Sequence, residues 1–112
     1  MIIYNVTVSV DHDVHEEWVL WMKNTHIPDV MATGLFLNSR LVRVLAEEEG
    51  GVTYAVQYTA ADMATYERYK NEHAPRLQAE TQRLYGGRFH AFRTLLEVLH
   101  SASPSDGSTV DL

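Results

Sequence analysis

Trp21–Val30 reads WMKNTHIPDV, and Tyr69–Gln78 reads YKNEHAPRLQ. In each segment an aromatic residue is followed by a histidine, and a proline stands two residues after that histidine (His26 and Pro28, His73 and Pro75). Proline disturbs an α-helix because it has no N–H to donate and its ring crowds the preceding turn. Since the same disturbance occurs twice, the two segments indicate a duplicated architecture.

Strand-like segments flank both of these segments. IYNVTVSV (residues 3–10) and VTYAVQYT (residues 52–59) alternate large apolar residues with small or polar ones, which is typical of half-buried strands. We expect two further strands, at about residues 36–46 and at RFHAFRTLLEVL, residues 88–99. A tight turn is expected at EEEGG, residues 47–51, because paired glycines suit a hairpin connection.

Two helices are expected between these strands. Asp13 starts a capping-box pattern, which predicts that the first helix begins there. That helix must bend or stop near Pro28, and Gly34 is its expected C-cap. Asp62 offers a cap for the second helix, which the glycine pair 86–87 ends.

The expected order of elements is therefore strand, helix, strand, strand, helix, strand. This order predicts an α+β, ferredoxin-like βαββαβ sandwich, in which one four-stranded antiparallel sheet carries both helices on one face. We expect one such domain over residues 1–100. Residues 101–112, SASPSDGSTVDL, have too little apolar surface to order themselves and are expected to form a flexible C-terminal tail.

Composition excludes several classes of function. The chain has 112 residues, no cysteine and a formal net charge of −6, so disulfides and thiolate chemistry are excluded and nucleic acid is not an expected partner. MIIYNVTVSVD, at the N-terminus, fits neither a signal peptide nor a membrane span, and we expect no membrane partner and a cytoplasmic location. No hydrolase, NTPase, zinc-protease or dinucleotide motif is found, and we expect no cofactor.

The sheet face opposite the helices is expected to need a cover. It shows Asn5, Thr7, Gln57 and Thr59, and we expect some of six further residues there: Leu37, Leu41, Arg43, Phe89, Ala91 and Arg93. A partly apolar face of this kind is most simply covered by a second copy, so we expect a homodimer joined through the sheet faces. A cavity between the paired sheets would hold a small molecule, with three polar handles: Arg43, Gln57 and Arg93.

His26 is the candidate catalytic residue. A neutral imidazole with an ordinary pKa near 6.5 can act as a general base or can bond a ligand inside the fold. The alternative is structural: His26 shares a helical stripe with Trp18 and Met22 and bonds a backbone carbonyl freed near Pro28. His73 has the same setting and the same two interpretations.

Other candidates also have two interpretations. Trp18 is the expected aromatic ligand contact, although aromatics at helical spacing, such as Trp18, Trp21, Tyr66 and Tyr69, also build cores. The arginines either clamp a carboxylate or pair with surface glutamates. DHDVHE, residues 11–16, carries possible metal ligands, but the capping pattern keeps its two histidines off one helical face, so we predict no metal site.

Longer segments resemble known families. MIIYNVTVSVD, WMKNTHIPDVMATG, YAVQYTAADMATYERY, HAPRLQ and FRTLLEV together resemble one bacterial family of unknown function over about residues 1–99. The aromatic–His-x-Pro pattern is similar to that of the dimeric α/β-barrel superfamily, which includes ethyl tert-butyl ether degradation-type proteins, muconolactone isomerases and cofactor-free antibiotic-biosynthesis-type monooxygenases. The resemblance implies a ferredoxin-like dimer in the bacterial cytosol and implies no particular reaction. No haem ligand is identified.

Three hypotheses of function follow. The first is a small-molecule-binding dimer that uses the barrel cavity. The second is a cofactor-independent isomerase or monooxygenase acting on a small cyclic or aromatic substrate, with His26 as its base. The third is a protein-interaction module without catalysis. An open cavity with converging polar groups favours the first two, and a closed, aromatic-packed interior favours the third.

Overall fold

The computed structural model describes residues 1–46 and 49–104. Its elements run in the order β1 (Ile2–Asp11), α1 (His15–Trp21), the π-helical turn η1 (Met22–His26), α2 (Ile27–Met31), β2 (Asn38–Arg43), β3 (Gly51–Ala60), α3 (Met63–Glu72), α4 (Ala74–Tyr85) and β4 (Phe89–Glu97). The turn predicted at EEEGG and the tail predicted from Ser101 lie partly outside the described residues. Within the described part of the chain, no helix is long and apolar enough to cross a membrane.

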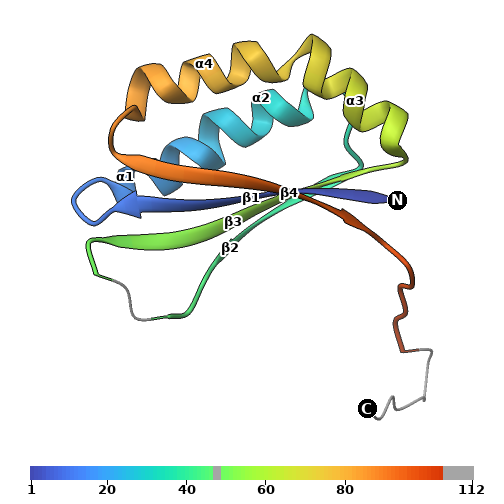
Figure 1. The fold of residues 1–112 in the computed structure, drawn as a ribbon, viewed down its shortest axis with the longest axis horizontal. Helices are drawn as coiled ribbons and strands as arrows, with labels where there is room; N and C mark the ends of the chain where they lie inside the picture. The colour runs from blue at the N-terminus through green and yellow to red at the C-terminus, as the bar shows by residue number, and fades with distance from the viewer. Residues whose placement is uncertain (47–48, 105–112) are drawn as a thin grey trace.

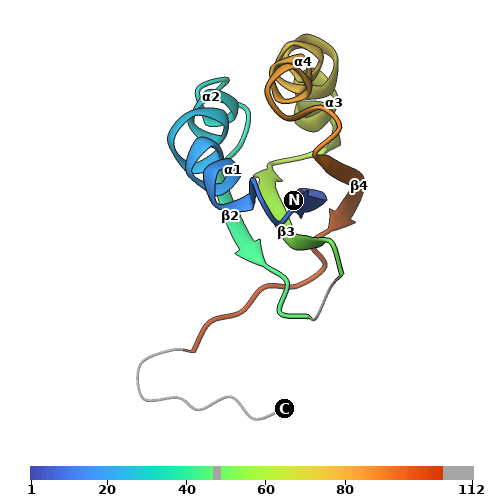
Figure 2. The same cartoon turned by 90° about the vertical axis from the view of Figure 1, so that its left-hand side faces the viewer.

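The strands form one antiparallel sheet in the order β2-β3-β1-β4. Figure 1 shows all the helices above this sheet, and Figure 2 shows the first crossover (α1 to α2) beside the second (α3 and α4) over the same face. Each crossover connects strands that are not neighbours in the sheet, which is the split βαβ arrangement. The predicted ferredoxin-like fold is confirmed.

The core lies between the helices and the sheet. Because neighbouring residues of a strand point to opposite faces, every second residue of β1 and β3 meets the helices. The buried residues of these strands include Tyr4, Val8 and Val10 from β1 and Val52, Tyr54, Val56, Tyr58 and Ala60 from β3. From the crossovers, the buried residues are Trp18, Met22, Val30, Tyr66, Tyr69, Ala74, Leu77 and Tyr85.

The two edge strands present different faces from those expected. Arg93 of β4 pairs with Val6, and Arg43 of β2 pairs with Tyr54. Directly paired residues share a face, so the prediction that these residues line the open face is wrong for five of them: Leu41, Arg43, Phe89, Ala91 and Arg93. The same pairing shows that the open face carries, from the edge strands, Arg40, Val42, His90, Phe92 and Thr94.

The start of the first helix also differs from the prediction. α1 begins at His15, and no side chain of the described residues caps it. Asp13 instead binds the guanidinium of Arg88, which also donates to Asp11 at 3.0 Å, and so ties β4 to the end of β1. The cap predicted at Asp62 is confirmed, because its carboxylate accepts from the Thr65 N–H at 2.8 Å.

Both prolines begin a second helical segment. Pro28 lies in the first turn of α2 and Pro75 in the first turn of α4, and the histidine two residues earlier is the N-cap in each case. The prediction that the proline stands at the same point of each crossover is therefore confirmed. The first helical path does not stop at Pro28; it passes through η1, where the Ile27 N–H bonds the Met22 carbonyl five residues earlier, and α2 ends at Met31.

Candidate ligand-binding site

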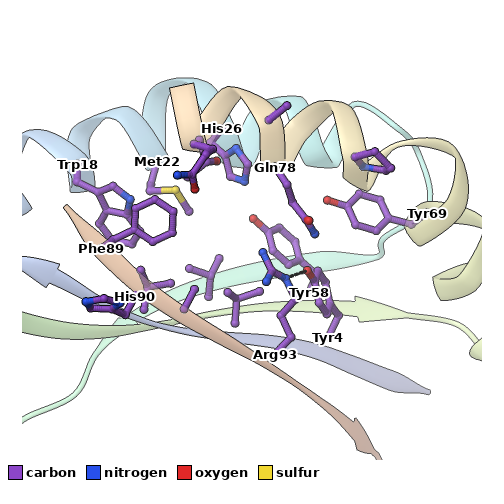
Figure 3. Close-up of a pocket in the computed structure, with 18 residues that line it drawn as sticks. Tyr4, Trp18, Met22, His26, Tyr58, Tyr69, Gln78, Phe89, His90 and Arg93 are labelled. Atoms are coloured by element: carbon purple, nitrogen blue, oxygen red, sulfur yellow. Dashed lines mark hydrogen bonds between the residues drawn. The ribbon is translucent and has the colours of Figure 1, made fainter. Parts of the chain in front are cut away.

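A cavity of about 560 Å³ lies between the helices and the sheet. Residues of β1, β3 and β4 line it on the sheet side, and residues of α1, η1, α3 and α4 line it on the helix side (Figure 3). Small side chains help to leave this space open, because Ala91 of β4 and Ala79 of α4 both face it. The cavity lies on the helix side of the sheet. The predicted cavity between two sheets requires a second copy and stays a prediction.

Polar side chains converge on the middle of this cavity. In Figure 3, His26 from η1 and Gln78 from α4 extend from the helices toward the hydroxyl of Tyr58 on the sheet. At one end, Arg93 Nε donates to the Tyr4 hydroxyl at 3.0 Å. The cavity therefore combines apolar walls with hydrogen-bonding groups from both layers, as small-molecule sites do.

Two buried polar groups at this cavity have no partner. The Trp18 Nε1–H and the Tyr58 hydroxyl make no hydrogen bond within the described structure, although these residues are only 1% and 2% exposed. Leaving a buried donor unsatisfied costs about 1–3 kcal/mol. Asn5 Oδ1 is also unpaired, but it lies on the opposite sheet face. Trp18 and Tyr58 therefore carry unsatisfied buried donors in the walls of this cavity.

Burial in the cavity wall favours the neutral forms of its titratable side chains. Burial lowers the pKa of His26 below its ordinary value of 6.5, and the nearby Asp29 carboxylate opposes this effect. Burial raises the pKa of Tyr58 and of Tyr69 far above 10, so both phenols stay protonated. The His26 ring lies beside the Trp21 ring, with centroids 5.0 Å apart and ring planes tilted by 31°, and neither of its ring nitrogens bonds another described residue. It is available as a neutral acceptor or base.

The structure brings together some of the residues chosen from the sequence and separates others. Trp18, His26 and Arg93 line the cavity. Arg43 lies on the same sheet face but does not line it, and Gln57 lies on the opposite face. The polar lining residues that sequence reasoning missed include Tyr58 and Gln78. A tyrosine hydroxyl on the inward face of a strand was a signal for Tyr58, whereas nothing in the sequence marked Gln78.

The remaining candidates have local partners. His73 lies outside the cavity and accepts a 3.0 Å hydrogen bond from Arg76 Nη2. His15, from the predicted DHDVHE cluster, shares a 2.8 Å hydrogen bond with the Tyr54 hydroxyl. No group of three or more metal-ligating side chains occurs in residues 1–46 and 49–104. Tyr66 is buried in the core beside Tyr4.

Several solved structures share the ferredoxin-like fold of this chain. HapK from Hahella chejuensis is 11% identical, with 94% of this chain and 99% of that chain covered and a TM-score of 0.70. A dimeric ferredoxin-like protein from an uncultured marine organism is 8% identical, with 92% and 99% covered and a TM-score of 0.66. SnoaB, a cofactor-independent oxygenase from Streptomyces nogalater, is 13% identical, with 89% and 95% covered and a TM-score of 0.62. At such identities the likeness shows the fold alone.

The chain belongs to the family described as Domain of unknown function (DUF4286), whose model matches residues 1–99. This match confirms the resemblance to a family of unknown function over the same residues. No curated protein is significantly similar in sequence to this chain. Because the family description names no reaction, the inference of function depends on the cavity.

Proposed function

We propose that this protein binds a small, planar, largely apolar molecule in the cavity between its helices and its sheet. The observation that carries the proposal is the Tyr58 hydroxyl, which is buried, unpaired and turned toward the cavity (Figure 3). A well-packed core would leave neither a polar group without a partner nor a space of about 560 Å³. That volume lies within the range of known ligand pockets, roughly 300–1,000 Å³.

The walls and the polar groups indicate what such a molecule resembles. Tyr58, Phe89 and Met22 provide flat or adaptable apolar contacts. The Trp18 N–H and the protonated Tyr58 hydroxyl supply donors, so the ligand is expected to carry oxygen acceptors such as carbonyl groups. An interaction module without a ligand would have no use for these unpaired donors.

A second candidate function is catalysis at His26. The observation in its favour is that a neutral imidazole, which has no hydrogen-bond partner among the described residues, lines the cavity, where it can remove a proton from a bound cyclic or aromatic substrate. π-Helical turns such as η1 also occur often at functional sites. The reaction would be a cofactor-independent isomerisation or oxygenation. Binding without turnover remains the first proposal, because every observation named here is explained by binding alone.

We also propose that two copies associate through the open sheet faces, and that the protein acts in the cytoplasm. Phe92 is 63% exposed on this face, and Val42 and Leu96 are exposed there too. One of the structural neighbours is itself a dimeric ferredoxin-like protein. In this arrangement each copy keeps its own cavity on the outer, helix-covered side of its sheet.

The proposal is tested by native mass spectrometry of the protein as purified from its host. Ala91→Phe fills the cavity, while Ala64→Phe adds the same side chain on an exposed part of α3 and serves as the control. We expect a small molecule to accompany the wild type and Ala64→Phe and to be absent from Ala91→Phe, with thermal melts confirming that all three are folded. Equal retention by the two variants would place the molecule elsewhere and overturn the proposal.

A further inference from the structure

A second cavity of about 310 Å³ adjoins the first. The two cavities share five lining residues: Tyr4, Tyr69, Pro75, Gln78 and Arg93. The second cavity adds Lys70 from α3 and the start of α4 at Ala74. Together they form one continuous space, lined by His26 and Trp18 in the first cavity and by Lys70 in the second.

The charged side chains that line this space, Lys70 and Arg93, are both positive. The chain contains 15 acidic residues, yet none of them is among the described residues that line either cavity. Three other cations are neutralised within the fold: Arg68 pairs with Glu72, Arg83 with Glu80, and Arg88 with Asp11 and Asp13. Lys70 and Arg93 have no carboxylate partner in the described part of the chain.

Arg93 is also held in a defined position. Its Nε donates to the Tyr4 hydroxyl at 3.0 Å, and Tyr4 is buried between β3 and α3 residues. This bond leaves the two terminal nitrogens of the guanidinium available, and they form the planar fork that matches a carboxylate. An oriented arginine beside an unpaired lysine indicates a position for an anionic group.

We infer that the two cavities form one site for a carboxylate with a planar apolar body, an inference that rests on the proposed function. The carboxylate binds between Arg93 and Lys70, and the body extends into the first cavity against Tyr58 and Phe89. A carboxylate fits better than a phosphate, because phosphate sites are commonly built from glycine-rich backbone, and no glycine is among the described lining residues.

The experiment compares 2-naphthoate with its neutral isostere 2-naphthamide by isothermal titration calorimetry of the full chain at pH 7.5. The variants are Arg93→Gln and Lys70→Met. Arg43→Gln is the matched control, because Arg43 lies on the same sheet face, has no carboxylate partner in the described residues and lines neither cavity. We expect naphthoate to bind wild type and Arg43→Gln at least roughly tenfold more tightly than naphthamide.

In Arg93→Gln the preference should fall to within about threefold, with a smaller fall in Lys70→Met, while naphthamide affinity is unchanged in both. Equal binding of acid and amide to the wild type, or a preference that survives both substitutions, would overturn the anion site. Tighter binding of 2-naphthyl phosphate than of 2-naphthoate would overturn the choice of carboxylate. If neither 2-naphthoate nor 2-naphthamide binds, or if Ala91→Phe binds both as tightly as the wild type does, the proposed ligand cavity and the anion site are both overturned.

Discussion

His26 and His73 hold equivalent places in the two crossovers but have different surroundings. Each is the N-cap residue of a segment whose first turn contains a proline. The ring of His26 lines the cavity without a hydrogen-bond partner in the described structure, whereas His73 accepts from Arg76 near the surface. The duplicated motif therefore gives both histidines the same place at the start of a helix, while the residues packed around each histidine determine its hydrogen bonding and exposure.

Substituting each histidine by glutamine tests this difference. His73→Gln loses at most one partly exposed hydrogen bond, so we expect a decrease in unfolding free energy of about 0.5 kcal/mol and unchanged ligand retention. His26→Gln should keep the fold and lose most of the molecule seen by native mass spectrometry. Equal retention by both variants would contradict the functional interpretation of His26.

The stability of the wild type should fall in acid partly because of His26. Its pKa is lower in the folded state than the ordinary 6.5, so below about pH 6.5 the unfolded chain binds a proton that the folded chain does not. Stability is therefore complete above that pH and is lost as pH falls. Urea titrations at pH 7 and pH 5 should show a smaller loss for His26→Gln than for the wild type. Identical losses would mean that burial does not perturb this imidazole.

Tyr58 and Tyr54 form a second matched pair, because both are buried tyrosines of β3. Tyr58→Phe removes a hydroxyl that has no partner among the described residues, so unfolding free energy should stay unchanged or rise by about 1 kcal/mol. Tyr54→Phe breaks the 2.8 Å bond to His15 and should cost about 0.5–1.5 kcal/mol. Urea denaturation measures both. A clear loss in Tyr58→Phe would show that its hydroxyl has a partner within the folded protein.

At the scale of the secondary-structure elements, the starts of α1 and α3 differ in whether the sequence alone predicts the N-cap correctly. Asp13 and Asp62 both precede a helix and both have the side chain of a good N-cap. Asp62 caps α3, but Asp13 is drawn to Arg88, a residue 75 positions later in the chain. The capping pattern near Asp13 is local in sequence, whereas Arg88 reaches Asp13 only because β4 pairs with β1. Only the tertiary structure could therefore show that Asp13 binds Arg88 and does not cap α1.

The effect of removing each carboxylate should reflect this difference. Asp62→Ala leaves the Thr65 N–H unsatisfied at the helix start and should lower Tm by roughly 4–8 °C, whereas Asp62→Asn should keep most of the stability. Asp13→Ala breaks an exposed ion pair and should lower Tm by less than Asp62→Ala. Differential scanning calorimetry measures all three. A larger decrease in Tm for Asp13→Ala would mean that the Asp13–Arg88 ion pair contributes more to stability than the helix cap does.

The strands show where sequence patterns suffice. β1 and β3 alternate cleanly because one face of each strand packs beneath the helices, and their inward residues were identified correctly. β4, FHAFRTLLE, mixes apolar and polar residues on both faces, because it is an edge strand beside a cavity and its other face is open. A one-residue shift exchanges the faces of a strand, so this mixed pattern could not fix its orientation.

At the scale of the whole molecule, the open sheet face supports a test of assembly. Phe92→Glu places a charge on the exposed aromatic residue of that face, and Leu20→Glu makes the same kind of change on an exposed position of α1. Light scattering should report about twice the chain mass of 12.8 kDa for the wild type and Leu20→Glu, and the monomer for Phe92→Glu. A dimer that persists in Phe92→Glu would mean that another surface joins the copies.

The site was only partly predictable because it is assembled from both layers. Trp18 and His26 could be chosen because helical spacing places them on one stripe. Arg93 was chosen for its charge but assigned to the wrong face. Gln78 reaches the cavity only because of the way α4 lies over the sheet, and the sequence of one element does not contain that information.

The π-helical turn also fixes the phase of the first crossover. Trp18, Met22, His26 and Val30 are spaced four residues apart, and all four face inward. In a regular α-helix each four-residue step overshoots a full turn by about 40°, so Val30 would be roughly 120° away from Trp18 around the axis. The wider winding of η1 absorbs part of that angle. Deleting one residue from Met22–His26 would therefore swing His26 and Val30 out of alignment with Trp18, and the cavity would lose a wall without any lining residue being substituted.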